Sequence, residues 1–119
     1  MAKTVLIVDD SLSIRQLVRA ALTSVGYGVI DAIDGQDALN KLVGQRVNLI
    51  ISDVNMPNMD GYRLTQRIRQ LGLTLPVVGV TANALAEEKQ RCLESGMDSC
   101  LSKPVTLDVL KQTLSVYAD

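Results

Sequence analysis

The sequence predicts an α/β domain in which a doubly wound, five-stranded parallel sheet carries five helices. Short apolar runs alternate about five times with stretches whose apolar residues recur at helical spacing. Several of these runs are continuously apolar, which is typical of strands that are covered on both faces. Strict alternation of strands and helices requires right-handed crossover connections, and these build a parallel sheet.

In the first part of the chain, residues 5–8 form the first predicted strand. A helix follows, with Ser11 as its candidate cap and Gly26 as its stop. Its helical spacing is carried by Ile14, Leu17, Val18, Ala21, Leu22 and Val25. Residues 29–32 form a second, more polar strand.

In the middle of the chain, Asp34 can cap a helix that carries Ala38, Leu39 and Leu42. Residues 47–52 form the third strand. Asp60 can cap the next helix, whose apolar face consists of Leu64, Ile68 and Leu71.

In the last part, Pro76 opens a strand at residues 77–80. A helix follows that ends at Gly96 and is marked by Leu85, Ala86, Cys92 and Leu93. Residues 99–102 form a short fifth strand. Thr106 caps the final helix, which is expected to bury Leu107, Leu110 and Leu114.

Strand polarity predicts the order of the sheet. The first, third and fourth strands are the most apolar and should be central, while the second and fifth should be edges. The order is then 2-1-3-4-5, a flavodoxin-like arrangement, with a switch of direction between strands one and three. Ligands of such sheets bind at that switch point, outside the carboxyl ends of the strands, where Asp9, Asp10 and Asp53 emerge.

Length and composition narrow the function classes. The 119 residues fit a single domain over residues 1–119, and 47% of them are hydrophobic, enough for an ordinary core. No apolar run reaches the length of a membrane span and no signal-peptide pattern opens the chain, so no membrane contact is expected. A net charge of −1 argues against a nucleic-acid partner.

Histidine and cysteine usage add further limits. The absence of histidine excludes Ser-His-Asp and Cys-His nucleophile systems and most zinc sites. Cys92 and Cys100 form no metal-ligand spacing and no disulfide framework. A reducing cytoplasm is therefore the expected location.

Polar side chains follow four of the predicted strands: Asp9 and Asp10, Asp53, Thr81, and Lys103. Taken singly, each is most often a helix cap, a loop residue or a surface residue. However, Ser11 already supplies one cap, and Asp53 caps nothing obvious. The case for a site rests on all five meeting at one edge of the sheet.

The three carboxylates predict a metal. Two carboxylates about 4 Å apart repel by about 4 kcal/mol at an effective dielectric near 20, and one lysine cannot offset three of them. A hard divalent cation can, and Mg²⁺ prefers oxygen ligands. We expect Asp10 and Asp53 to bind Mg²⁺ directly and Asp9 directly or through water. The backbone carbonyl of Asn55 would complete the protein ligands, and Mn²⁺ is a possible substitute.

With the metal bound, Asp53 is a plausible nucleophile toward phosphorus, because a carboxylate needs no base to activate it. The cation and Lys103 would offset charge on the transferring group. Thr81 could donate a hydrogen bond to a phosphoryl oxygen, and the small Ala82 would leave access. Pro104 could hold Lys103 in place through a cis peptide bond.

The chain resembles response-regulator receiver domains, the phosphoacceptor modules of two-component signalling. The resemblance covers essentially all of it and rests on five motifs: Asp9-Asp10, Asp53 with Asn55-Met56-Pro57, Asp60-Gly61, Thr81-Ala82 and Lys103-Pro104.

By resemblance, Asp53 accepts a phosphoryl group from a phosphohistidine on a histidine kinase or a histidine phosphotransfer domain. Asp9, Asp10 and the Asn55 carbonyl bind Mg²⁺, while Thr81 and Lys103 contact the phosphoryl group. The domain is then not an enzyme but a switch that assists its own phosphorylation and slow dephosphorylation and acts on an unidentified downstream protein. Asn55 and Asn83 match positions that tune the dephosphorylation rate.

A finer likeness divides the chain. From about residue 52 to residue 117 it resembles the receiver of a capsule-regulating hybrid sensor kinase, whereas the first 45 residues resemble small chemotaxis-type regulators. One interpretation is an engineered chimeric scaffold that keeps the site without a physiological partner. The other is a natural stand-alone regulator.

Two further points bear on mechanism. The family often has Tyr or Phe three residues before the lysine, where this chain has Cys100, so any switch at this place should be weaker or differently built. A flavodoxin-like topology also permits a flavin or nucleotide binder. The loop Asp9-Asp10-Ser11 argues against that function, because phosphate cradles favour Gly, Ser and Thr.

Overall fold

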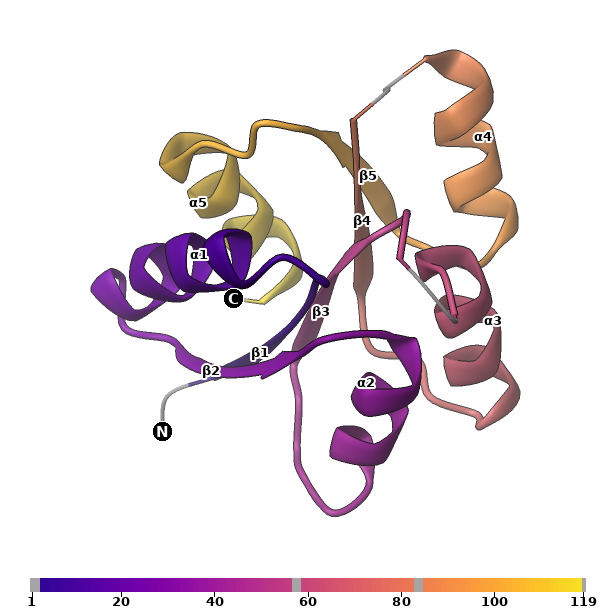
Figure 1. The fold of residues 1–119 in the computed structure, drawn as a ribbon, viewed down its shortest axis with the longest axis horizontal. Coiled ribbons are helices and arrows are strands. Elements are labelled where there is room, and N and C mark those ends of the chain that lie inside the picture. The colour runs from indigo at the N-terminus through magenta and orange to yellow at the C-terminus, as the bar shows by residue number, and fades with distance from the viewer. Residues whose placement is uncertain (1–2, 57–58, 83–84, 119) are drawn as a thin grey trace.

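The computed structural model describes residues 3–56, 59–82 and 85–118, and within them a parallel sheet lies between two layers of helices (Figure 1). The strand order is β2-β1-β3-β4-β5, with every neighbouring pair parallel. The strands are β1 Thr4–Val8, β2 Gly28–Ala32, β3 Leu49–Asp53, β4 Val77–Thr81 and β5 Ser99–Ser102. The predicted fold class and strand order are confirmed.

The helices begin where short polar side chains satisfy free backbone N–H groups. They are α1 Leu12–Ser24, α2 Gly35–Leu42, α3 Gly61–Gln70, α4 Ala86–Glu94 and α5 Leu107–Tyr117. The four predicted caps each accept a hydrogen bond from the N–H three residues on, namely Ser11, Asp34, Asp60 and Thr106. In the part of the chain that the structure describes, no helix is long and apolar enough to cross a membrane.

Helices lie on both faces of the sheet (Figure 1), and an apolar core cluster lies between the helices and each face. Helices α1 and α5 cover one face with Val18, Leu22, Leu110 and Leu114. Helices α2, α3 and α4 cover the other face with Ala38, Leu39, Leu64, Ile68 and Cys92. The central strands β3 and β4 are buried along their whole length. Burial on both faces explains why these runs are continuously apolar.

Several apolar residues that mark the predicted helices lie instead on the surface, namely Leu17, Leu71, Leu85, Leu93 and Leu107. Leu17 is 64% exposed, because the buried stripe of α1 runs through Arg15, Val18 and Leu22. Leu71 is the residue that ends α3, and Leu107 is the first residue of α5, so both lie beyond the turns that face the sheet. The expectations that Leu71 lies on the apolar face and that Leu107 is buried are therefore wrong.

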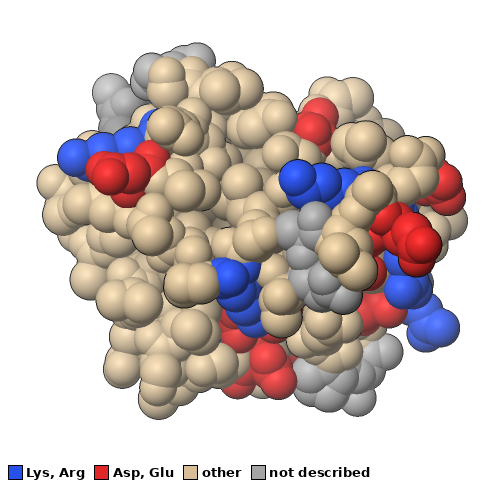
Figure 2. Space-filling view, turned by 90° about the horizontal axis from the view of Figure 1, so that it is seen from above, with Lys and Arg blue, Asp and Glu red and all other residues tan. Residues whose placement is uncertain are grey.

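Charged side chains of both signs are scattered over the face of the molecule shown in Figure 2, and much of that face is neither acidic nor basic. As far as the described residues show, no broad basic field covers this face. This distribution agrees with the net charge of −1.

Candidate functional site

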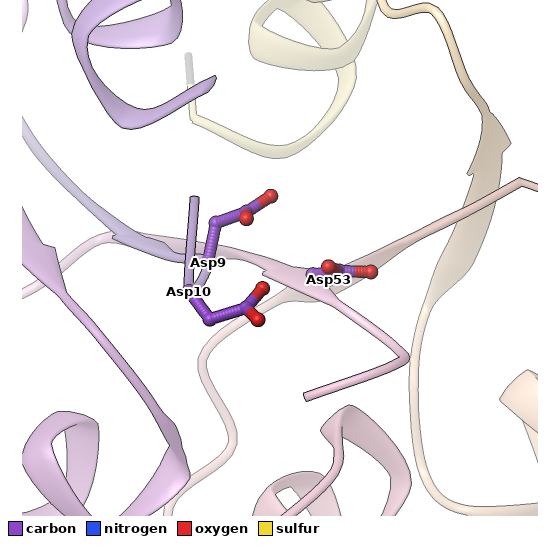
Figure 3. A group of neighbouring side chains, drawn as sticks. All are labelled: Asp9, Asp10 and Asp53. Atoms are coloured by element: carbon purple, nitrogen blue, oxygen red, sulfur yellow. The ribbon is translucent and has the colours of Figure 1, made fainter. Parts of the chain in front are cut away.

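Three carboxylates meet at the carboxyl ends of β1 and β3. Asp9 and Asp10 follow β1, Asp53 is the last residue of β3, and their side chains lie close together (Figure 3). One carboxylate oxygen from each lies within 4.8 Å of the others. Asp9 and Asp53 are only 4% and 5% exposed, whereas Asp10 is open to solvent. The strand order thus brings together acids that are more than 40 residues apart in the sequence.

Lys103, which directly follows β5, supplies a positive charge to this cluster. Its Nζ atom lies 3.2 Å from Oδ2 of Asp53. The backbone holds it there, because the Lys103 N–H donates to the carbonyl of Thr81 at 2.8 Å. The Lys103–Pro104 peptide bond is cis, as expected from the sequence. One ammonium beside three carboxylates leaves the site negative when all four groups are charged.

Two tight turns orient the acids. The N–H of Ser11 donates to Oδ1 of Asp9 at 2.8 Å, and the N–H of Asn55 donates to Oδ1 of Asp53 at 3.2 Å. In each turn a side chain accepts a hydrogen bond from the backbone two residues on, which fixes its direction. Each bonded acid keeps a second carboxylate oxygen that can serve as a ligand.

Arg15 is a supporting residue that sequence reasoning missed. It is buried, and its Nη1 donates to the carbonyl of Asp9 at 2.8 Å while its Nε lies 3.2 Å from Oδ2 of Asp31. It therefore ties the acidic loop to β2. The available signal was its spacing, since Arg15 shares a helical stripe with Val18 and Leu22.

Gly61 allows α3 to begin directly against the backbone of Asp53. A Cβ atom at this position would lie 2.6 Å from the Asp53 carbonyl oxygen and 2.9 Å from the Cα of Val54. The N–H of Gly61 also donates to the carbonyl of Val54 at 3.1 Å. A residue without a side chain is required for so close an approach.

The electrostatics of the site favour a cation. Burial is the largest cause that raises the pKa of Asp9 above its ordinary value, and the nearby charge of Asp53 raises it further, against the hydrogen bond from Ser11. The Asp9 carboxylate therefore resists ionisation in the absence of a cation. All three side chains offer oxygen atoms, which suit hard ions such as Mg²⁺ or Mn²⁺ better than soft metals.

The remaining predicted site residues border the acids. Thr81 ends β4, is 1% exposed and pairs in register with Ser102, and the exposed Ala82 follows it. A cavity of about 310 Å³ opens beside Asp53 and Lys103 and is lined mainly by apolar side chains such as Val80.

Asn55 lies exposed just past Asp53. The role of its carbonyl as a ligand stays a prediction. Pro57 and Asn83, which were singled out from the sequence, lie outside the described residues.

Comparison with known proteins identifies the family of the chain. The model of the response regulator receiver domain family matches residues 5–115. The chain belongs to this family. Its receiver fold is shared with chemotaxis protein CheY4 of Vibrio cholerae, at a TM-score of 0.93 and 38% identity, over 98% of this chain and 99% of that one.

Curated relatives of higher identity are sensor kinases. The receiver is 73% identical to sensor histidine kinase RcsC of Salmonella typhimurium over 115 residues, and 70% identical to RcsC of Escherichia coli K12. The match covers 97% of this chain but only 12% of the RcsC sequence. The solution structure of the Escherichia coli RcsC C-terminus aligns with a TM-score of 0.82 and 70% identity, over 98% of this chain and 87% of that one.

The extent of the RcsC match bears on the suggested chimera. Because the likeness runs over 97% of the chain, it includes most of the first 45 residues as well as the later part. The division into two sources is therefore not supported. The assignment to the receiver family is confirmed.

Proposed function

We propose that this domain accepts a phosphoryl group on Asp53 from a phosphohistidine, in a step that requires Mg²⁺. The observation that carries the proposal is the cluster itself, a buried Asp53 within 4.8 Å of two other carboxylates and 3.2 Å from an ammonium. Relatives named sensor histidine kinases support a donor histidine on a kinase or on a phosphotransfer domain. We also propose that the domain is located in the cytoplasm, as its cysteines led us to expect.

The carboxylates of Asp9, Asp10 and Asp53 would hold the ion, with the Asn55 carbonyl as a further ligand. When bound, Mg²⁺ or Mn²⁺ supplies positive charge that offsets the charge on the transferring phosphoryl oxygens. The raised pKa of Asp9 is consistent with a site that is completed by a cation.

The chain's own residues then have distinct tasks. A carboxylate oxygen of Asp53 attacks phosphorus, the bond from phosphorus to the donor imidazole nitrogen breaks, and the imidazole leaves with the electron pair. The Lys103 ammonium, already beside Asp53, would pair with a phosphoryl oxygen. Thr81 would donate its hydroxyl hydrogen to another, and the exposed Ala82 leaves the approach open.

Slow reversal would return the domain to its resting form. Water attacks phosphorus, the bond to the Asp53 oxygen breaks, and the carboxylate is restored with release of inorganic phosphate. The domain is thus a switch rather than an enzyme that acts on a separate substrate. Its phosphorylated form would act through a downstream protein, and the bias on that contact is limited by the difference in affinity for the two forms.

The test is to incubate the domain with a small acyl phosphate and Mg²⁺ and to record intact mass. We expect one added phosphoryl mass that disappears in Asp53→Asn and after chelation of the metal by EDTA. Asp60→Asn is the matched control, because Asp60 caps α3 and asparagine caps as well as aspartate. Equal labelling of Asp53→Asn and the unaltered domain would contradict the proposal.

A second measurement separates a working switch from an inert copy. Phosphotransfer is followed from a panel of histidine kinases and histidine phosphotransfer domains. A working switch should accept phosphate from at least one donor much faster than from acyl phosphate. Equally slow transfer from all of them would favour a scaffold that keeps the site without a physiological partner.

A further inference from the structure

The two cysteines of the chain are in direct contact across the boundary between α4 and β5. Cys92 lies in the last turn of α4 and Cys100 lies in β5, and their Sγ atoms are 2.6 Å apart. Carbon atoms that are not bonded to each other rest about 3.5–4.0 Å apart, and a sulfur atom is no smaller than a carbon atom. The fold therefore presses the two thiols together, although eight positions separate them in the sequence.

We propose that Cys92 and Cys100 form an oxidation site at which a hydroperoxide converts the two thiols into an intramolecular disulfide. The thiolate of Cys100 attacks the peroxide, giving a sulfenic acid and releasing water or an alcohol once the leaving oxygen is protonated. The Cys92 sulfur then attacks that sulfenic sulfur, the S–O bond breaks, and the hydroxyl group leaves as water with the Cys92 proton. Two thiols are oxidised and one peroxide is reduced.

The backbone around the pair is already held in place. After α4, the N–H of Met97 donates to the Cys92 carbonyl at 3.1 Å, and the Ser95 hydroxyl donates to the same carbonyl at 2.7 Å. The N–H of Asp98 then donates to the carbonyl of Val77 in β4 at 2.8 Å. The connection is thus anchored to the helix at one end and to the sheet at the other. Because the two Sγ atoms already lie 2.6 Å apart, a disulfide bond of about 2.05 Å needs only a small further approach.

Exposure decides the order of the two steps. Cys92 is fully buried, whereas Cys100 is partly open, so a small oxidant reaches Cys100 first. Burial raises the pKa of Cys100 to about 12, with further contributions from Cys92 and Glu88 against Lys89. Thiolate is therefore scarce, and the pair differs from fast redox sensors, which have lowered pKa values. We expect slow oxidation that is favoured by proximity.

The disulfide would restrain the structure because of where it lies. It would tie α4 covalently to β5, three residues before Lys103. Cys100 is the position at which the family often has Tyr or Phe. Oxidation should restrain α4, and the inference stands independently of whether Asp53 is phosphorylated.

To test this, the native domain is oxidised with hydrogen peroxide and its remaining free thiols are alkylated in denaturant. The peptides are then mapped by mass spectrometry. Trypsin leaves both cysteines in one peptide, because no Lys or Arg lies between them and Lys103 precedes a proline. Cleavage after Glu94 separates them, so two peptides joined by a reducible bond identify the link. We expect a loss of two hydrogen masses, a thermal midpoint raised by several degrees, and reversal by dithiothreitol.

Cys100→Ser and Cys92→Ala are the matched variants, and neither should lose two hydrogen masses. Cys100→Ser decides the matter if the buried Cys92→Ala fails to fold, because Cys100 is at the edge of the sheet. The inference is overturned if peroxide leaves both thiols open to alkylation. It is equally overturned if Cys100 is carried to sulfinic or sulfonic acid, or joins a second chain, while Cys92 stays reduced.

Discussion

Asp9 is the residue at which burial and charge act most directly against ionisation. Only 4% of it is exposed, and it lies in the cluster with Asp10 and Asp53. Its folded-state pKa is raised, first by burial and then by the charge of Asp53. An acid whose pKa is raised on folding destabilises the folded state once the pH exceeds its ordinary value of about 3.9.

We therefore predict that Asp9→Asn makes the metal-free domain more stable. At pH 7 in EDTA the free energy of unfolding should rise by about 1–4 kcal/mol, the range of a like-charge interaction at about 4 Å between bulk water and an effective dielectric near 20. The gain should shrink as the pH falls through the raised pKa of Asp9 and should vanish below about 3.9, where the native aspartate is neutral in both the folded and the unfolded state. Urea denaturation at several pH values measures this.

With Mg²⁺ added, the unaltered domain should become more stable than Asp9→Asn. A ligand that binds only the folded state stabilises it, and the variant has lost one of the carboxylates proposed to bind the ion. Asp60→Asn, which changes a capping acid outside the cluster, should show no comparable gain in EDTA. A variant Asp9→Asn that is less stable than the unaltered domain without metal would contradict this account.

At the scale of elements, the start of α3 packs directly against the strand end that carries Asp53. The helix begins at Gly61 against the Asp53 carbonyl, and the cap Asp60 precedes it. This contact joins a helix on one face of the sheet to the strand end that carries the site. A side chain at Gly61 must push the helix away from the strand.

We predict that Gly61→Ala costs about 1–3 kcal/mol of stability, as overpacking of a tight contact does. It should also slow the labelling of Asp53 by acyl phosphate at temperatures where the variant is folded. Circular dichroism melts and intact mass record the two effects.

Gly26→Ala is the matched control. Gly26 has a φ of +92° and open space around it, so alanine there should cost about 1–2 kcal/mol through backbone strain alone. Labelling of Asp53 should be unchanged in this variant. Equal loss of labelling in both variants would show that general destabilisation is responsible.

At the scale of the whole molecule, the amino ends of β4 and β5 are held by Arg69 from α3. Its Nε and Nη2 donate to the Gly96 carbonyl at 3.1 and 2.9 Å, and its Nη1 donates to the Leu75 carbonyl at 2.7 Å. Nη2 also lies 3.1 Å from Oδ2 of Asp98. One guanidinium thus joins a helix, the entry to β4 and the connection into β5.

We predict that Arg69→Lys lowers stability by about 1–3 kcal/mol, because an ammonium cannot reproduce the planar fork that reaches several acceptors. The rate of Asp53 labelling should stay the same, since Arg69 acts at the end of the sheet opposite the carboxylates. Arg67→Lys, on the exposed side of the same helix, should stay within about 0.5 kcal/mol. Slower labelling in Arg69→Lys would show that the two ends of the sheet are coupled.

The sequence by itself was sufficient for the fold class, the strand order, the helix caps and the residues that gather at the carboxyl edge. These follow from local rules. Apolar runs mark strands, short polar residues cap helices, and a parallel sheet aligns its strand ends. These rules therefore predict that one edge of the sheet brings together Asp9, Asp10, Asp53 and Lys103.

Only the tertiary structure decided which side chains support the site and which thiols touch. Arg15 holds the Asp9 carbonyl, Gly61 meets the Asp53 carbonyl, and Cys92 reaches Cys100 across two elements. Each contact depends on how a helix is rotated and seated on the sheet. Periodicity determines that rotation only to within about a residue, and it carries no information on the distance between atoms of different elements.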